Sequence, residues 1–259
     1  DLGWGTVFGG QVLGQALSAA VQTVPAERAP HSLHGYFLRP GDVTRPIIYE
    51  VDRIRDGSSF TTRRVVAIQH GRAIFNMSAS FQIEEPGLEH QSEMPEVEGP
   101  QGLLNEVELA ERIAEMIPES MRERALAERP IEQRPISPVN PLDPEVRQPQ
   151  HHVWYRAARD LPEDPRLHRY LLAYASDFNF LTTATRPHGV SWLSPKMQMA
   201  SLDHAMWFHR PFRMDQWLLH VIESPTAAGG RGLVRGHFFT QDGELVASTA
   251  QEGLIRMHE

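Results

Sequence analysis

The feature that most constrains the fold of this 259-residue chain is an internal duplication. Sliding the sequence against itself places the Arg-Pro at 39–40 on the Arg-Pro at 210–211. With one residue of slippage, the Gln-x-Gly turn at 69–71 falls on its counterpart at 241–243. Both halves thus carry the same order of strand, Arg-Pro, strand, Gln-x-Gly turn and strand. Two copies of one unit predict a pseudo-dimer within a single chain rather than a solenoid.

Within each copy, one helix precedes a run of strands. In the first copy, apolar residues recur at helical spacing in "GGQVLGQALSAAVQTV" (9–24). Each glycine lowers the stability of a helix by up to about 1 kcal/mol. A helix with so many small residues therefore requires a structural explanation, and close wrapping by a sheet is one. Alternating segments separated by turn signals predict four strands, at 31–39, 44–55, 59–69 and 73–83.

The second copy repeats this order behind an additional strand. Its expected elements are a strand at 151–158, a helix at 165–185, and strands at 196–209, 216–224, 231–241 and 245–256. Because the first copy shows no strand before its helix, we expect the equivalent strand to lie upstream of Asp1.

The segment between the copies, 84–150, is rich in Pro and Glu and contains one amphipathic helix at about 103–127. We interpret it as a solvated linker, with an active element as the alternative. The chain then divides into an N-terminal module (1–83), this linker and a C-terminal module (151–259). One helix with several antiparallel strands, present twice, predicts an α+β fold in which a sheet wraps a helix twice over.

Composition and missing motifs exclude several functions. No apolar run reaches the length of a membrane helix, and a net charge of −8 argues against nucleic-acid binding. The absence of cysteine excludes a thiol nucleophile and favours the cytoplasm, and no secretory signal or peroxisomal tripeptide is visible. The chain has no P-loop, no GxGxxG and no GxSxG, since "GVSWL" (189–193) lacks the second glycine. We therefore expect neither a nucleotide cofactor nor a serine nucleophile.

Asp177 and Asn179 interrupt the apolar side of the helix expected over 165–185. Asp177 is either the cap of a helix that restarts there or a catalytic group. Helix-compatible residues continue on both sides without a break, which favours the second explanation. A carboxylate in apolar surroundings is costly unless it is hydrogen-bonded, and its pKa tends to rise, which makes Asp177 a candidate for catalysis.

The stretch "SLDHAMWFHRP" (201–211) is unusually polar for a buried strand. A regular strand places alternate residues on opposite faces, with Leu202, His204, Met206 and Phe208 on one face and Ser201, Asp203, Ala205 and Trp207 on the other. His204 and His209 either satisfy one another structurally or belong to a site. We expect no metal, because no HExxH or carboxylate–histidine spacing is present.

Gln251 lies in the last expected strand, where the first copy has the small, apolar Ala79. If only one copy carries Asp177, Ser201 and Gln251, that copy supplies the polar side chains of the site. The other copy then supplies backbone groups and residues that line the site.

These segments closely resemble the acyl-CoA thioesterase II family, namely "FGGQVLGQAL", "HSLHGYFLRPGD", "DGSSFTTRRV", "YASDFNFL" and the long run from "LDHAMWFHRPF" to "TQDGELVASTAQEGLIR". The resemblance covers the chain from about residue 1 to its end and is loosest across 84–150. It implies a double hotdog fold, in which two antiparallel sheets each wrap a central helix and pack side by side. It also implies hydrolysis of acyl-CoA to free fatty acid and CoA, no cofactor, and association into a homo-oligomer (a dimer or tetramer of double hotdogs).

The resemblance places the family's catalytic residues at Asp177, Ser201 and Gln251. The hydroxyl position is Thr in the best-known form of the motif, but serine can make the same hydrogen bonds. We expect the three side chains to hold one water, with Asp177 as general base. Backbone N–H groups at the start of the first helix, Gly9-Gly10-Gln11, are the candidate oxyanion donors.

Two alternatives have less support. An enoyl-CoA hydratase with the same fold would carry D-x-N-P-x-H, whereas "DFNFLT" has Phe180 and Thr182 in place of Pro and His. A non-catalytic acyl-CoA-binding protein would not require Asp177, Ser201 and Gln251 together.

Overall fold

The structure, a computed structural model, describes residues 5–258. The N-terminal half contains α1 (Gly9–Val21), β1 (Arg28–Phe37), β2 (Ile48–Asp56), β3 (Phe60–Gln69) and β4 (Arg72–Ile83). The middle segment contains α2 (Glu106–Arg112), α3 (Glu119–Ala125) and β5 (Ile131–Pro135). The C-terminal half contains β6 (Gln150–Ala157), α4 (Pro165–Ala175), the 3-10 helix η1 (Leu181–His188), β7 (Met197–Ser201), β8 (Asp203–Phe208), β9 (Leu218–Ala228), β10 (Arg231–Thr240) and β11 (Leu245–Met257).

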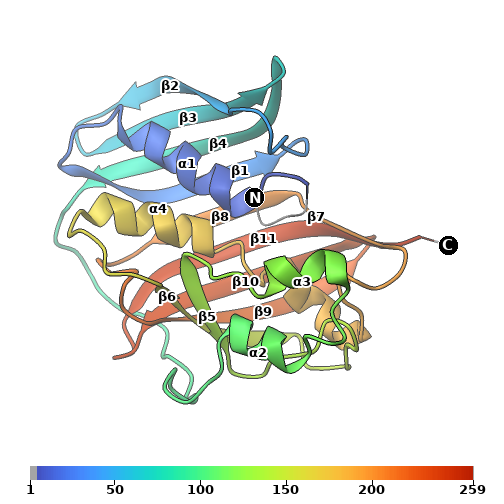
Figure 1. Cartoon of the computed structure of the whole chain (residues 1–259). Coiled ribbons are helices and arrows are strands. Elements are labelled where there is room, and N and C mark those ends of the chain that lie inside the picture. Colours follow the sequence, from blue (N-terminus) through green and yellow to red (C-terminus); the bar gives the residue numbers. More distant parts are fainter. Residues whose placement is uncertain (1–4, 259) are drawn as a thin grey trace.

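Eleven strands of the described chain form one antiparallel sheet in the order β2-β3-β4-β1-β8-β11-β10-β9-β6-β5, with β7 beside β11 (Figure 1). The orders β2-β3-β4-β1 and β9-β10-β11-β8 are equivalent, which confirms the duplication. The halves meet where β1 pairs with β8, with Gly35 opposite His204. The two sheets of the expected double hotdog therefore join edge to edge into one sheet. The strand expected upstream of Asp1 lies outside the described residues.

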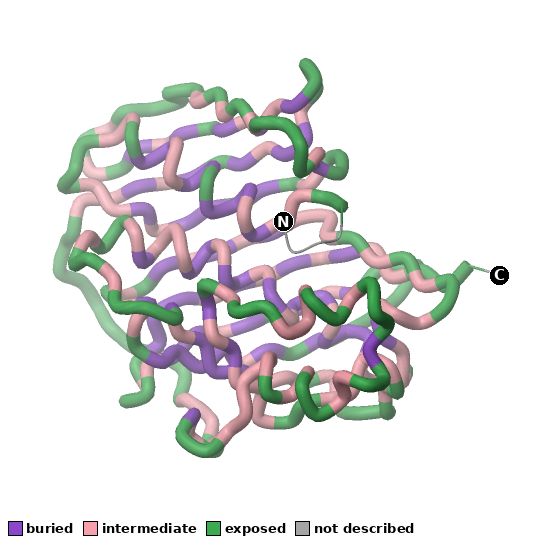
Figure 2. Tube along the Cα trace, in the orientation of Figure 1, coloured by how far each residue is buried: buried purple, intermediate pink, exposed green. Residues whose placement is uncertain are grey.

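Helices α1 and α4 lie side by side on one face of this sheet (Figure 1). A Cβ atom placed on Gly10 would be 2.2 Å from the carbonyl oxygen of Tyr174, and one on Gly14 would be 2.8 Å from that of Tyr170. The glycines of α1 therefore allow two helix backbones to approach closely, whereas the sequence suggested only wrapping by the sheet. Leu13 and Leu17 of α1 are fully buried in the main core, and burial in Figure 2 follows the strands and the inner sides of the helices.

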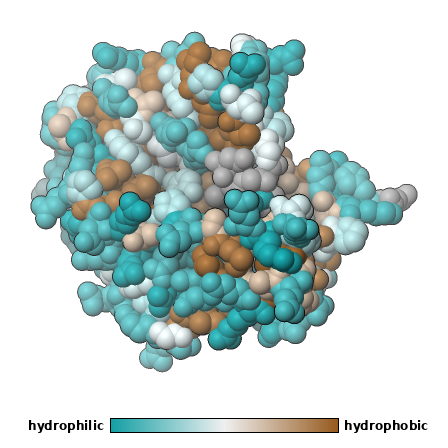
Figure 3. All heavy atoms as spheres, in the orientation of Figure 1, coloured by the Kyte–Doolittle hydropathy of each residue, from teal (hydrophilic) through white to brown (hydrophobic). Residues whose placement is uncertain are grey.

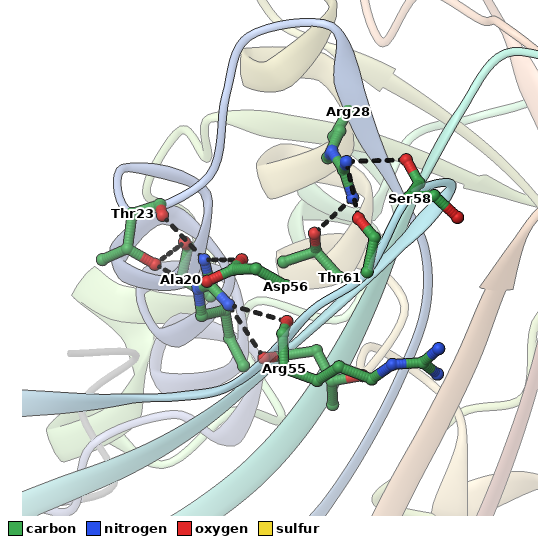
Figure 4. Close-up of polar contacts among 10 residues, drawn as sticks. Ala20, Thr23, Arg28, Arg55, Asp56, Ser58 and Thr61 are labelled. Atoms are coloured by element: carbon green, nitrogen blue, oxygen red, sulfur yellow. Dashed lines mark hydrogen bonds and ion pairs between the residues drawn. The ribbon is translucent and has the colours of Figure 1, made fainter.

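A buried arginine holds the far end of α1. The guanidinium of Arg63 donates to the carbonyl oxygen of Thr23 at 3.0 Å, to Thr23 Oγ1 at 2.8 Å and to Asp56 Oδ1 at 2.6 Å. Figure 4 shows Thr23 and Asp56 on either side of these contacts, with a second set joining Arg28 to Ser58 and Thr61. Arg63 thus satisfies a carbonyl group beyond the end of the helix.

The prediction of one amphipathic helix over 103–127 is wrong. Two short helices form, α2 and α3, because Pro118 disfavours helical geometry in the residue before it and takes the N-cap position of α3. Segment 84–150 also contributes β5, which extends the sheet beside β6, so it is more than a solvated linker. The backbone N–H of Gln133 in β5 donates to Glu106 at the start of α2, which fixes this helix over the C-terminal half.

None of the helices described over residues 5–258 has both the length and the apolar character required to cross a membrane. On the face drawn in Figure 3, hydrophobic side chains reach the surface at several places beside the helices that cover the sheet.

Candidate active site

The helix expected over 165–185 is interrupted. Helix α4 ends at Ala175, and Asn179 adopts a left-handed φ of 59° before η1 begins. Asn tolerates this conformation better than most residues, and its side-chain amide donates to Gln133 Oε1 at 2.7 Å and to Tyr155 Oη at 3.1 Å. Both a continuous helix and a helix capped by Asp177 are therefore wrong. Asp177 lies in the break, which frees its side chain from either helix.

The start of α1 in the other half receives the Asp177 carboxylate. Its Oδ2 atom accepts a hydrogen bond of 2.9 Å from the backbone N–H of Gly10. A Cβ atom on Gly9 would be only 2.7 Å from the same oxygen, so a larger residue at position 9 would displace the carboxylate. The positive end of the helix dipole also stabilises a negative charge here.

The strand expected over 196–209 is split by a β-bulge. Ser201 of β7 lies opposite Gly253, whereas Ala205 of β8 lies opposite Ala250, so one extra residue stands on the β7–β8 side. The side chain of Asp203 compensates for part of the disrupted ladder, because its Oδ1 atom accepts the backbone N–H of Glu252 at 2.6 Å.

The bulge changes which side chains share a face. Residues directly opposite one another in an antiparallel pair point to the same side of the sheet. Gln251 shares a face with Gly253, so both Ser201 and His204 lie on the face of Gln251. The prediction that Ser201 and His204 lie on opposite faces is wrong because it assumed a regular strand.

Asp177, Ser201 and Gln251 lie together in the structure. The Nε2 amide of Gln251 donates to Ser201 Oγ at 2.7 Å, and both side chains hydrogen-bond to the Asp177 carboxylate. Burial raises the pKa of Asp177 above its usual range, while nearby His204 and the hydrogen bonds from Gly10, Gln251 and Ser201 oppose this rise. The site therefore combines a buried acid with donors that stabilise its charged form.

His204 is a residue of this cluster that the sequence did not assign to the site. Its Nδ1 atom lies 2.6 Å from Gln251 Oε1 and its Nε2 atom 2.9 Å from Ser176 Oγ. His209 instead contacts Ser248 Oγ, at 2.8 Å, so the two histidines do not satisfy one another. The duplication contained the signal that could have identified His204, because alignment of the two copies places this histidine where the first copy has the apolar Leu33.

A cavity of about 490 Å³ is lined in part by Asn179, which is two residues from Asp177 along the chain. Its walls come from α2, α3, β5, η1 and the loops at 138–145 and 190–193. Its lining is largely apolar, with Leu109, Ile113 and Met121 among its residues, and it also includes Gln133 and Asn179. Within residues 5–258, no group of three or more acidic or histidine side chains is arranged to bind a metal ion.

Comparison with known proteins gives a consistent result. The family model described as "Acyl-CoA thioesterase" matches residues 120–254, and that described as "Acyl-CoA thioesterase N-terminal domain" matches residues 1–82. The chain is 46% identical to acyl-CoA thioesterase 2 of Haemophilus influenzae, over 100% of this chain and 91% of that protein. It is 44% identical to human acyl-coenzyme A thioesterase 8, over 97% and 81% of the two chains. The crystal structure of the acyl-CoA thioesterase II TesB2 from Mycobacterium marinum superposes with a TM-score of 0.79 at 43% identity, covering 97% and 90%.

Proposed function

Because this chain belongs to the acyl-CoA thioesterase family, we propose that it hydrolyses fatty acyl-CoA to a free fatty acid and CoA, using a water molecule activated by Asp177. One observation carries the proposal. A buried carboxylate, a hydroxyl and an amide from three separate segments form one hydrogen-bonded cluster beside the junction of the halves. A non-catalytic acyl-CoA-binding protein would gain no binding energy from such a cluster, because burying an ionisable group is unfavourable.

In the proposed reaction, Ser201 and Gln251 orient a water molecule and Asp177 accepts its proton. The water oxygen attacks the thioester carbonyl carbon, and collapse of the tetrahedral intermediate breaks the C–S bond. The sulfur of CoA leaves with the electron pair and takes up the proton that Asp177 accepted, while the acyl group leaves as the carboxylic acid. The raised pKa of Asp177 brings this carboxylate closer to the pH at which a general base is most effective.

The candidate oxyanion donors are revised. Gly10 N–H donates to Asp177, and Gln11 N–H donates to the carbonyl oxygen of Phe8 at 3.1 Å. We assign Gly10 to holding the carboxylate and Gln11 to the first turn of the helix. Gly9 keeps its assignment as a donor to the oxyanion, because it lies at the same positive helix end.

The cavity at Asn179 is suited to the acyl chain of the substrate. It is bounded by side chains of α2 such as Leu109 and Ala110, and its volume is within the range of small-molecule sites. Enlarging Ala110 to Leu should lower kcat/KM for long acyl chains and spare short ones. A uniform change across a ladder of chain lengths would place the acyl chain elsewhere.

The test of the proposed function is release of free thiol from acyl-CoA by the purified protein. We expect Asp177→Asn and Gln251→Ala to fold normally and to lose most of kcat. Gln69→Ala is a matched control, because Gln69 is also buried and hydrogen-bonded but binds backbone of the loop at 42–45 in the other half. Full activity in either site variant would contradict the assignment. Association into a homo-oligomer and a cytoplasmic location stay predictions, and light scattering on the same preparation tests the first.

A further inference from the structure

We propose that His204, supported by Ser176, is a positioning residue that determines which end of the Gln251 amide faces Asp177. This inference rests on the proposed function, since Gln251 matters only if it orients the attacking water. His204 and Ser176 are both completely buried, so neither side chain exchanges its contacts with solvent.

The contacts form a directed chain. His204 lies 2.6 Å from the carbonyl oxygen of the Gln251 amide, and the amide nitrogen donates to Ser201 Oγ at 2.7 Å. A carbonyl oxygen can only accept a hydrogen bond, so His204 Nδ1 carries a proton in this arrangement. The amide nitrogen of Gln251 is thereby turned toward Ser201 and Asp177. The opposite orientation would place an amide oxygen against the carboxylate and leave His204 Nδ1 without an acceptor.

In the proposed arrangement Ser176 completes the hydrogen bonding of the imidazole by donating its hydroxyl proton to Nε2. A neutral imidazole has one N–H group, so a proton on Nδ1 leaves Nε2 as an acceptor. The Ser176 hydroxyl lies 2.9 Å from His204 Nε2 and can supply the donor. Because a hydroxyl has one proton, donation to Nε2 takes the place of its hydrogen bond to the carbonyl oxygen of Ala173, which is also 2.9 Å away. Such outer contacts commonly fix the tautomer of a functional histidine.

The duplicated half shows that the fold itself does not require this pair. Continuing the register of β8 and β11 by one residue beyond Ala205 and Ala250 places His204 opposite Gln251, in agreement with the contact between their side chains. The equivalent strands β1 and β4 place Leu33 opposite Ala79, and both residues are buried and apolar. The same sheet therefore packs well with a leucine–alanine pair at this position. A histidine–glutamine pair is present only in the half that carries Asp177.

The experiment measures kcat and KM for thiol release by the full chain carrying His204→Leu, His204→Asn or Ser176→Ala. The leucine variant copies the residue of the other half and removes both contacts. The asparagine variant keeps an amide N–H near the place of Nδ1. We expect kcat to fall about 100-fold in His204→Leu, with KM within about twofold. We expect His204→Asn to recover about tenfold of that loss and Ser176→Ala to lose about fivefold.

A double-mutant cycle separates positioning from general packing. If His204 acts through Gln251, His204→Leu should cause no further loss in a Gln251→Ala background. His168→Leu is the control, because His168 is equally buried on α4 but binds the backbone N–H of Met214. It should lower the unfolding temperature and leave kcat unchanged.

Four outcomes overturn the inference, the last of them together with the proposed function. The first is wild-type thiol release with unchanged kcat in His204→Leu, which leaves the proposed function intact. The second is additive losses in the cycle, which would assign His204 a role independent of Gln251. The third applies if the His204→Leu variant does not fold. Unchanged kcat in both His204→Asn and Ser176→Ala then overturns the inference. Absence of thiol release by the wild-type protein would instead refute the proposed function and this inference with it.

Discussion

Replacing Gly10 by Ala tests whether the close approach of α1 to α4 determines the geometry of the site. The added Cβ would lie 2.2 Å from the carbonyl oxygen of Tyr174, whereas ordinary contact begins at 3.4 Å. The helices must therefore separate by about 1 Å. The same movement stretches the 2.9 Å hydrogen bond from Gly10 N–H to Asp177 beyond its useful range.

The expected effect on stability is moderate. Overpacking costs about 1–3 kcal/mol, and the gain in helix propensity from Gly to Ala returns up to about 1 kcal/mol. The expected effect on catalysis is larger, because a 1 Å displacement of a catalytic group lowers the rate about 100-fold. Urea unfolding measures the first quantity, and thiol release from acyl-CoA measures the second.

Gly14→Ala is the matched control. Its Cβ would lie 2.8 Å from the carbonyl oxygen of Tyr170, one turn further along the same pair of helices. We expect a similar loss of stability with a change in kcat of less than about fivefold. Equal losses of kcat in the two variants would mean that helix spacing in general, and not the Gly10–Asp177 contact, limits activity. Unchanged kcat in Gly10→Ala would refute the reasoning altogether.

Three further predictions concern other parts of the molecule. Asp203→Ala should lower kcat at least about tenfold by freeing Glu252 N–H and relaxing the bulge, whereas Asp203→Asn, which keeps an acceptor, should retain most activity. Burial lowers the pKa of His220 well below its usual value, so the unfolded chain binds a proton that the folded chain excludes. The unfolding free energy should therefore fall as pH drops below about 6.5, and His220→Phe should reduce this slope by about 1.4 kcal/mol per pH unit. Arg63→Met should lower the unfolding free energy by about 2 kcal/mol and leave kcat unchanged, because Arg63 binds the end of α1 opposite Gly10.

The duplication and nearly all strands could be predicted from the sequence, because alternating apolar residues and turn signals are local. The bulge after Ser201 could not. It depends on a hydrogen bond between Asp203 and the backbone of Glu252, which is distant in sequence. From His204 onward, a regular strand and a strand with a bulge before it have the same alternation of apolar residues. Periodicity alone therefore does not reveal the extra residue.

The break after α4 has a similar cause. Local propensity favours a helix through Asp177, but Asn179 is held in a left-handed conformation by partners on β5 and β6, Gln133 and Tyr155. These contacts exist only after the chain has folded. Asp177 and Gln251 stood out in the sequence as polar residues in apolar segments, and the family resemblance assigned them together with Ser201 as the catalytic set. Their catalytic roles stay predictions. The proposed role of His204 could be inferred only from the structure, in which the pairing of β8 with β11 brings His204 to Gln251.

The continuous pairing of β1 with β8 has an evolutionary consequence. In a dimer of identical subunits, every substitution appears at both symmetry-related positions, so a gain at one position can be cancelled by harm at the other. Joining the copies in one polypeptide removes that constraint. Leu33 and Ala79 can then be selected for packing alone, while the opposite half is free to acquire an acid. The proposed site occurs once in each polypeptide, so we expect active-site titration to count one per chain.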